Sequence, residues 1–290
     1  MKRRVLLLLS EMRVKQWTKN LLVYSAPLFN GSLFNPHDFA MASIVFLAFC
    51  LAGSGIYIIN DIYDLDKDRL NPAKCRRPIA AGTLGIIPAL FCSAISLMIG
   101  LLVSLAANIY CFCILVSYVL VNVLYTIRLK HVVIIDVMII AYGFVARAVC
   151  GAEASGLKIT AWFILCIMFL SLFLALGKRR CELNELQNEK ISEARNVLKY
   201  YSLGLIDHMM SITTSGLIMS YALFTMDSST RNNQAMAVTI PVVVYGIFYY
   251  LYIVHVKHEG GSPDEALYRE KPILAAVVIY VLMILLIRTH

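Results

Sequence analysis

Residues Asn60 to Gly82 read NDIYDLDKDRLNPAKCRRPIAAG and lie between two apolar runs. This stretch indicates both the fold and the chemistry of the chain, because it gathers four carboxylates and five cationic side chains at the end of an apolar segment. Each residue of an α-helix turns by about 100°, so four of its polar side chains are predicted to share one helix face while Asp66 points elsewhere. These four are Asn60, Asp61, Asp64 and Asp68. The stretch therefore predicts a polar site at the edge of a membrane.

The chemistry of this predicted site follows from its oxygen atoms. Carboxylates that lie close together raise one another's pKa unless a cation lies between them, and Mg²⁺ takes oxygen ligands, usually together with substrate phosphates. We therefore expect Asp61, Asp64 and Asp68 to hold Mg²⁺ on a diphosphate. The alternative is a solvated acidic helix end that pairs with nearby Lys and Arg side chains. The basic half of the stretch, Lys67 to Arg77, and its membrane setting favour the metal site.

The composition indicates an integral membrane protein. Of the 290 residues, 60% are apolar, compared with roughly 45–50% in soluble proteins, and the mean hydropathy is +0.74. At about 20 residues per span, the expected fold is an all-α, polytopic helical bundle of about nine transmembrane helices, forming one domain over residues 1–290. The apolar runs lie at about 20–35, 38–60, 84–106, 109–127, 132–151, 160–177, 209–226, 236–256 and 272–288.

The basic residues indicate how the chain is oriented. Most of the 26 Lys and Arg residues fall in alternate loops, so the positive-inside rule places the N-terminus and the polar loops 61–83 and 178–208 in the cytoplasm. Residues 1–19 are predicted to form an interfacial segment on that side. The net charge of +8 is grouped by loop, so membrane topology and anionic substrates explain it better than a nucleic-acid partner does. The sequence leaves a homo-oligomer open.

The second long polar loop again combines acidic and basic side chains. Four of its residues recur on one helix face, namely Lys178, Glu182, Glu185 and Glu189. A Lys–Glu pair four residues apart is often only a surface salt bridge. A functional role for this loop is therefore supported only by its pairing with the first acidic stretch.

Ionisable residues also occur inside and beside the apolar run 132–151. Asp136 and Arg147 lie eleven residues apart, which is nearly three helical turns, so they share a helix face. Charged groups within a membrane usually face a cavity or a partner, and we expect both to line a polar chamber; structural pairing with other helices is the alternative. Arg128 and Lys130 form a cationic turn before this run, which suits a phosphate clamp or serves only as a topology signal.

The pattern Asn60-Asp61-x-x-Asp64-x-x-x-Asp68, followed by Arg77-Pro78 and Gly82, resembles the first aspartate-rich motif of the UbiA superfamily of intramembrane prenyltransferases. Further stretches resemble the decaprenyl-phosphate phosphoribosyltransferase branch of this superfamily. They are RVKQWTKN at 13–20, RRPIAAG at 76–82, YTIRLKHVVIIDV at 125–137, FVARAVCG at 144–151, LGKRRCEL at 176–183 and SPDEALYREKPI at 262–273. The resemblance covers nearly the whole chain, and the combined motifs are more specific than the aspartates alone.

This resemblance implies transfer of a 5-phosphoribosyl group from phosphoribosyl pyrophosphate to a long-chain polyprenyl phosphate, with release of pyrophosphate, on the cytoplasmic side of a bacterial-type inner membrane. In that reaction Mg²⁺ on the aspartates would bind the pyrophosphate, Asn60 would fix an oxygen and Glu182 would meet the ribose. Arg147 would polarise the inner wall, and Asp136 and Glu185 would also lie at the substrate. The residues expected to clamp phosphates are Lys19, Lys74, Arg77, Arg128, Lys130, Lys178 and Arg179.

One departure from the superfamily pattern concerns its second motif. That motif usually contains two aspartates, DxxxD, whereas this chain has KRRCELNE at 178–185. The departure argues against a second metal site built on two aspartates. Glu182 and Glu185 would replace it only in part, by orienting a sugar hydroxyl or Lys178.

Two other functions are consistent with parts of the sequence. The nearer one is a UbiA-type prenyltransferase that joins a prenyl diphosphate to an aromatic or lipophilic acceptor. That reaction handles one diphosphate, whereas the phosphoribosyl reaction brings three phosphate-bearing groups together, which the basic residues at 74–77, 128–130 and 178–180 favour. The other is a transporter, since charges within spans mark ion pathways. Transporters tend to bind substrate near the membrane midplane, whereas these carboxylates cluster at its edge.

Overall fold

The computed structural model describes residues 7–8, 10–71, 74–187, 196–227, 233–258 and 269–289. All regular secondary structure in these ranges is helical, and the chain forms two compact units. Unit 1 consists of Met1–Pro27, Phe34–Lys130 and Ala146–Leu157, and unit 2 consists of Leu28–Leu33, His131–Val145 and Lys158–His290. Helix α7 (Ile135–Ala154) contributes its first half to unit 2 and its second half to unit 1.

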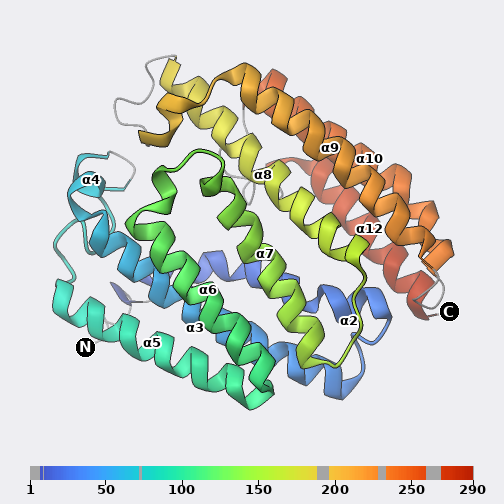
Figure 1. Ribbon diagram of the computed structural model, residues 1–290, viewed down its shortest axis with the longest axis horizontal. Helices are drawn as coiled ribbons and strands as arrows, with labels where there is room; N and C mark the ends of the chain where they lie inside the picture. Colours follow the sequence, from blue (N-terminus) through green and yellow to red (C-terminus); the bar gives the residue numbers. More distant parts are fainter. Residues whose placement is uncertain are drawn as a thin grey trace. The chain divides into compact units, whose positions relative to one another are not determined.

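Unit 1 is built around helix α3 (Pro36–Tyr63). This helix packs along α5 (Ile86–Ala107) and α6 (Ile109–Ile127), as Figure 1 shows. The 3₁₀ segment η1 (Val14–Tyr24) lies against α3, and the short helix α4 (Leu65–Leu70) follows its carboxyl end. The acidic stretch is therefore carried by the central helix of this unit.

Small residues allow α3 and α5 to approach each other closely. A side chain at Gly100 of α5 would press on the backbone of α3, because the carbonyl oxygen of Ala48 lies 3.0 Å from the position of a Cβ. Ser93 of α5 donates a hydrogen bond to the carbonyl of Gly55 at 2.8 Å. Small residues and interhelical hydrogen bonds hold helices together in lipid, so these contacts fix the helix that carries the acidic residues.

Unit 2 consists mainly of two packed helix pairs. Helix α8 (Ala161–Gln187) packs along α9 (Leu203–Met226), and α10 (Ile240–Tyr252) packs against α12 (Lys271–Thr289) (Figure 1). The rings of Phe173 on α8 and Tyr250 on α10 lie 5.1 Å apart, which joins the two pairs. The remaining short elements among the described residues are α2 (Ser25–Asn30), η2 (Leu129–His131), η3 (Asn196–Tyr200), η4 (Asn233–Thr239) and the π-helical turn η5 (Ile253–Lys257).

Eight helical segments of the described residues are long and apolar enough to cross a membrane. The exposed face of α5 carries large apolar side chains such as Ile87 and Phe91. The expected all-α, multi-pass membrane bundle is therefore confirmed. The first of the nine expected spans, 20–35, is instead divided between η1 and α2, where polar residues and Pro27 interrupt the apolar run. The cytoplasmic placement of the N-terminus stays a prediction.

Candidate active site

The acidic stretch forms the end of α3 and the start of α4. Asn60 and Asp61 lie in the last turn of α3, and Asp68 lies on α4. The helix expected to carry these residues is interrupted, because Asp64 leaves helical geometry (φ −93°, ψ 13°) and separates the two elements. Such a break agrees with the low helix propensity of Asp and Asn, whose side chains compete for backbone hydrogen bonds. Asp66 points away as expected, with its side chain 97% exposed.

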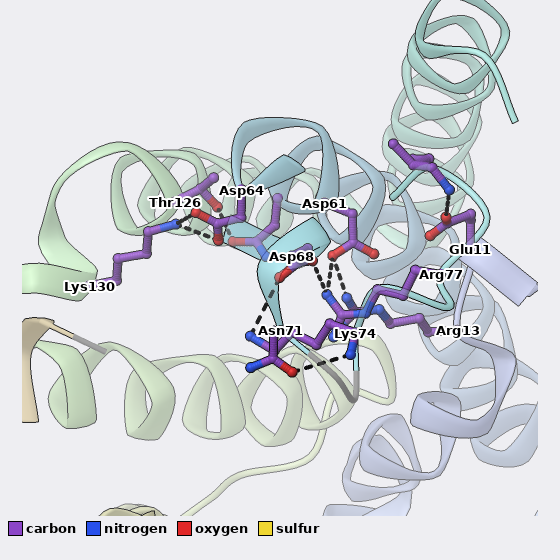
Figure 2. A network of polar contacts seen from close by, with 12 residues as sticks. Glu11, Arg13, Asp61, Asp64, Asp68, Asn71, Lys74, Arg77, Thr126 and Lys130 are labelled. Atoms are coloured by element: carbon purple, nitrogen blue, oxygen red, sulfur yellow. Dashed lines mark hydrogen bonds and ion pairs between the residues drawn. The ribbon is translucent and has the colours of Figure 1, made fainter. Parts of the chain in front are cut away.

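Arg77 joins two of the aspartates. Its Nη1 lies 2.9 Å from Oδ1 of Asp61 and 2.5 Å from Oδ2 of Asp68 (Figure 2). Lys74 adds a second cation 3.6 Å from Asp68. Asp61 and Asp68 are only 2% exposed, whereas the Arg77 and Lys74 side chains that pair with them remain partly exposed. The carboxylates therefore pair with basic residues, as the alternative interpretation expected, but they are buried instead of solvated.

Asp64 has a cation of its own. Nζ of Lys130 donates hydrogen bonds to both oxygens of this carboxylate, at 2.6 and 2.7 Å (Figure 2). The same ammonium lies 5.0 Å from the centre of the Tyr63 ring. Lys130 is buried, whereas Arg128 in the same cationic turn is exposed. Of these two residues, only Lys130 contacts an aspartate in the described part of the chain.

The N-terminal segment supplies two residues that are missing from the predicted site. Arg13 forms an ion pair with Asp61 and lies 4.9 Å from the centre of the Tyr57 ring. Glu11 is buried and accepts a hydrogen bond from the N–H of Ile79 at 2.6 Å (Figure 2). Arg13 opens the RVKQWTKN motif, which is the only sequence signal for this contact. Glu11 and Ile79 are 68 positions apart, and no periodicity links them.

The environment of Glu11 changes its protonation. Burial raises the pKa of Glu11 to about 7, and although the N–H of Ile79 lowers this pKa, the neighbouring charge of Asp61 raises it further. The acidic cluster therefore contains one carboxyl group that is partly protonated near neutral pH.

The oxygen donors of this cluster fit a divalent cation. Within the described ranges no three His, Cys, Asp or Glu side chains already converge as a finished metal site. The donors are nevertheless carboxylate and amide oxygens, which Mg²⁺ prefers. Oδ2 of Asp61 is buried and has no hydrogen-bond partner within the described residues. The chemistry of these donors therefore suits a divalent cation, although in this structure Asp61, Asp64 and Asp68 pair with Arg and Lys side chains.

Unit 2 contains a second polar cluster, which surrounds Arg179. This guanidinium is 1% exposed and donates to Asp136 at 2.8 Å and to Glu182 at 2.6 Å. Tyr201 donates its hydroxyl proton to Asp136 at 2.7 Å and accepts from the N–H of Ile134 at 2.8 Å. Burial, together with the hydrogen bond to Asp136, raises the pKa of Tyr201. Asp136 is thus held by two buried partners within unit 2.

Arg147 has different partners from Asp136, although both lie on α7. Its Nε donates to Asn20 at 2.6 Å and its Nη2 donates to the hydroxyl of Tyr118 at 2.9 Å. The guanidinium also lies 5.3 Å from the centre of the Phe49 ring. Asp136 and Arg147 therefore bind different residues, although both were expected on one face of the helix.

Three further predicted residues lie on helical elements, and two of them, Lys178 and Glu185, lie on α8 instead of in a loop. Lys19 is partly exposed on η1, and Lys178 and Glu185 are partly exposed on α8. Glu189 and most of the SPDEALYREKPI stretch lie outside the described residues.

Comparisons with known proteins agree on one family. Residues 28–261 match the UbiA prenyltransferase family. A decaprenyl-phosphate phosphoribosyltransferase from Corynebacterium glutamicum is 33% identical over 96% of this chain and 86% of its own length. A protein of the same name from Mycolicibacterium smegmatis is 31% identical, over 91% of this chain and 86% of its own.

One solved structure with the same architecture is a UbiA homolog from Archaeoglobus fulgidus bound to GPP and Mg²⁺. It matches with a TM-score of 0.76 at 16% identity, covering 98% of this chain and 100% of that chain. This likeness shows a shared fold.

Proposed function

Because this chain belongs to the UbiA prenyltransferase family, we propose that it is a polyprenyl-phosphate phosphoribosyltransferase. It transfers the 5-phosphoribosyl group of phosphoribosyl pyrophosphate to a polyprenyl phosphate and releases pyrophosphate. The observation that carries the proposal is the similarity to a decaprenyl-phosphate phosphoribosyltransferase along 96% of the chain. A lipid-borne acceptor also agrees with the eight apolar helical segments.

The nucleophile in this reaction is the lipid phosphate. One of its oxygens forms a bond to C1 of the ribosyl group while the bond between C1 and the pyrophosphate oxygen breaks, and the electron pair leaves with pyrophosphate. No general base is required, because the attacking oxygen is already ionised at neutral pH. The protein must instead hold several anionic groups together and stabilise the charge of the leaving group.

The cations around the aspartates suit this task. Arg77, Lys74 and Lys130 are positioned by their ion pairs with the aspartates, and Arg13 provides a fourth cation. When anionic phosphates enter, the same cations turn toward them. A hydrogen bond to a charged group contributes about 1.5–3 kcal/mol, so a few such contacts suffice to retain the donor.

The carboxylates take the complementary role. Asp61, Asp64 and Asp68 would hold Mg²⁺ with Asn60 as a neighbouring oxygen donor, and the ion would supply Lewis-acid stabilisation of the pyrophosphate charge. In unit 2, Glu182 forms an ion pair with Arg179, and we assign it to the ribose of the donor. We place this chemistry on the cytoplasmic side of a bacterial-type inner membrane, because the polar loops carry most of the basic residues.

The decisive experiment separates this reaction from that of a UbiA-type prenyltransferase. Membranes containing the protein are incubated with Mg²⁺, ribose-labelled phosphoribosyl pyrophosphate and polyprenyl phosphates of several chain lengths. We expect label in the organic phase and none when Mg²⁺ is chelated. Absence of lipid-borne label with every chain length, together with product from a prenyl diphosphate and an aromatic acceptor, would overturn the proposal.

A further inference from the structure

One face of helix α3 contacts the N-terminal segment beside the acidic cluster. Ser54, Tyr57 and Asp61 are spaced i, i+3 and i+7, so they form one stripe along the helix. Asp61 forms an ion pair with Arg13 (Figure 2), and the centre of the Tyr57 ring lies 4.9 Å from the Arg13 guanidinium. Ser54 is the third member of the stripe, and the proposed reaction gives it no role.

The hydroxyl of Ser54 binds two residues of the N-terminal segment. It donates to the carbonyl of Met12 at 2.8 Å and accepts from Nε1 of Trp17 at 3.1 Å. Serines in helices often donate to a carbonyl of the preceding turn, as Ser104 of α5 does. Ser54 is 1% exposed and instead directs its hydrogen bonds to a segment outside its helix. It therefore fastens the N-terminal segment to α3.

The backbone of Arg13 shows what this contact achieves. Its φ and ψ are both 51°, in the left-handed region that residues other than glycine rarely adopt. Such a conformation persists only where the surrounding structure holds it. The carbonyl of Met12 belongs to the same peptide unit as the N–H of Arg13, and Ser54 holds that carbonyl. On the other side, the carbonyl of Arg13 accepts from the N–H of Gln16 at 2.7 Å.

The Arg13 side chain begins at this constrained backbone and ends at Asp61. We propose that Ser54 is a positioning residue, whose hydroxyl holds the backbone between Met12 and Arg13 so that the Arg13 guanidinium lies where the diphosphate of the substrate binds. The inference rests on the proposed function, which assigns Arg13 to the phosphates. Ordering a charged side chain before the ligand arrives lowers the entropic cost of binding. Because Ser54 acts through Arg13, losing its hydroxyl should weaken binding less than losing the guanidinium does.

The test measures the Kd of inorganic pyrophosphate with Mg²⁺, by calorimetry on the full-length protein in detergent. Pyrophosphate is the product both of the proposed reaction and of a UbiA-type prenyltransferase. Ser54→Ala should raise this Kd about fivefold, which corresponds to the loss of one hydrogen bond. The same variant should raise KM for phosphoribosyl pyrophosphate by a similar factor and leave KM for the lipid phosphate unchanged. An unchanged Kd for pyrophosphate would refute the proposal.

Ser96→Ala is the matched control. Ser96 lies on α5, is 4% exposed and donates to a carbonyl of α3, that of Leu51, at 2.8 Å. Both alanine variants remove a buried hydroxyl that bonds a backbone carbonyl, so both should lower Tm. Ser96→Ala should nevertheless keep the wild-type Kd for pyrophosphate. If it weakened pyrophosphate binding as much as Ser54→Ala, the effect would reflect a general loss of stability and the proposal would fail.

A double-mutant cycle tests whether Ser54 acts through Arg13. In an Arg13→Met background, Ser54→Ala should cause no further rise in Kd, because the effects of coupled residues are not additive. A further fivefold rise in that background would contradict the proposal. Ser54→Cys offers a second variant that retains the shape of the side chain with a weaker hydrogen-bond donor. Its Kd should exceed that of the wild type, and an equal Kd would count against the proposal even if Ser54→Ala did not fold.

The two proposals fail in different ways. A wild-type protein that binds pyrophosphate but transfers no phosphoribosyl group would overturn the proposed function and leave the role of Ser54 standing. A wild-type protein that transfers the phosphoribosyl group, with a Ser54→Ala variant that binds pyrophosphate equally well, would overturn the role of Ser54 alone. A wild-type protein that binds no pyrophosphate would overturn both.

Discussion

The ammonium of Lys130 lies 2.6 and 2.7 Å from the two carboxylate oxygens of Asp64, although 66 positions separate the two residues in the sequence. Lys130 is buried, so this pair is shielded from solvent in a way that a surface salt bridge is not. The contact joins the cationic turn after α6 to the acidic end of α3. Under the proposed function it marks Lys130 as a phosphate-binding residue.

Lys130→Met should lower kcat/KM for phosphoribosyl transfer by about tenfold or more, because one charge-assisted hydrogen bond to a phosphate is lost. Steady-state kinetics with labelled donor measure this. Lys67→Met is the control, since Lys67 is exposed on α4, and its kinetics should match those of the wild type. If the kinetics of Lys130→Met match those of the wild type, Lys130 serves only as a positive charge that sets the orientation of the chain in the membrane.

Asp61→Asn and Asp64→Asn should each lower activity by about 100-fold or more, because each removes charge from the proposed oxygen site for Mg²⁺. Donor binding measured by calorimetry with and without Mg²⁺ should lose its metal dependence. Asp66→Asn is the matched control, because that side chain is 97% exposed. Full turnover in both active-site variants, with the wild-type Tm retained, would discredit the metal assignment.

Arg13→Met should weaken donor binding about tenfold, since Arg13 contacts Asp61 and contributes a cation to the same site. Arg13→Lys should restore part of the affinity because the charge is kept. The control is Lys15→Met, which removes an exposed cation from the same segment. If Arg13→Met and Lys15→Met bind the donor equally well, Arg13 has only a structural role.

Glu11 should make the stability of the protein depend on pH. Its pKa is raised from 4.5 to about 7, so the unfolded chain loses this proton more easily than the folded protein does. Its contribution to stability is therefore most favourable below pH 4.5, falls through the window from about 4.5 to about 7, and is constant above it. The difference amounts to about 3 kcal/mol at 1.36 kcal/mol per pKa unit.

Unfolding of the metal-free protein between pH 4.5 and 8 tests this. Glu11→Gln keeps an oxygen that can accept from the N–H of Ile79 but cannot ionise, so its stability curve should be flatter across the window. Parallel curves for the wild type and Glu11→Gln would show that Glu11 does not titrate there.

Tyr201→Phe should lower the free energy of unfolding by about 1–3 kcal/mol, because buried Asp136 loses a hydrogen-bond donor and the N–H of Ile134 loses an acceptor. Tyr200→Phe changes the neighbouring side chain, which is 71% exposed, and should have no measurable effect. Tm values in the same detergent measure the difference. Equal values for the two variants would contradict the hydrogen-bond network assigned to Arg179 and Asp136.

Much of the fold and part of the site could be predicted from local patterns. The long apolar runs predict membrane helices, and the spacing of Asp61, Asp64 and Asp68 predicts that they lie near one another and near a basic loop. Helix periodicity fails at Asp64, because a break in the backbone depends on local hydrogen-bond competition that spacing does not show. Helix periodicity also does not reveal that Asp136 and Arg147 bind different partners, because it identifies a shared helix face but not the residues that pack against that face.

The features that could not be predicted depend on contacts between segments that are distant in the sequence. Arg13 and Asp61 are 48 positions apart, and one sequence contains no signal that pairs them.

The pairing of Arg13 with Asp61 has a practical consequence for work with this enzyme. A deletion that removes residue 13, or a bulky affinity tag fused close to it, changes the electrostatics of the carboxylates directly, although every membrane-spanning helix stays intact. Loss of turnover in such a shortened or tagged protein would therefore report damage to the proposed active site, even when expression level and membrane insertion are normal. Tags for purification and labelling belong at the other end of the polypeptide.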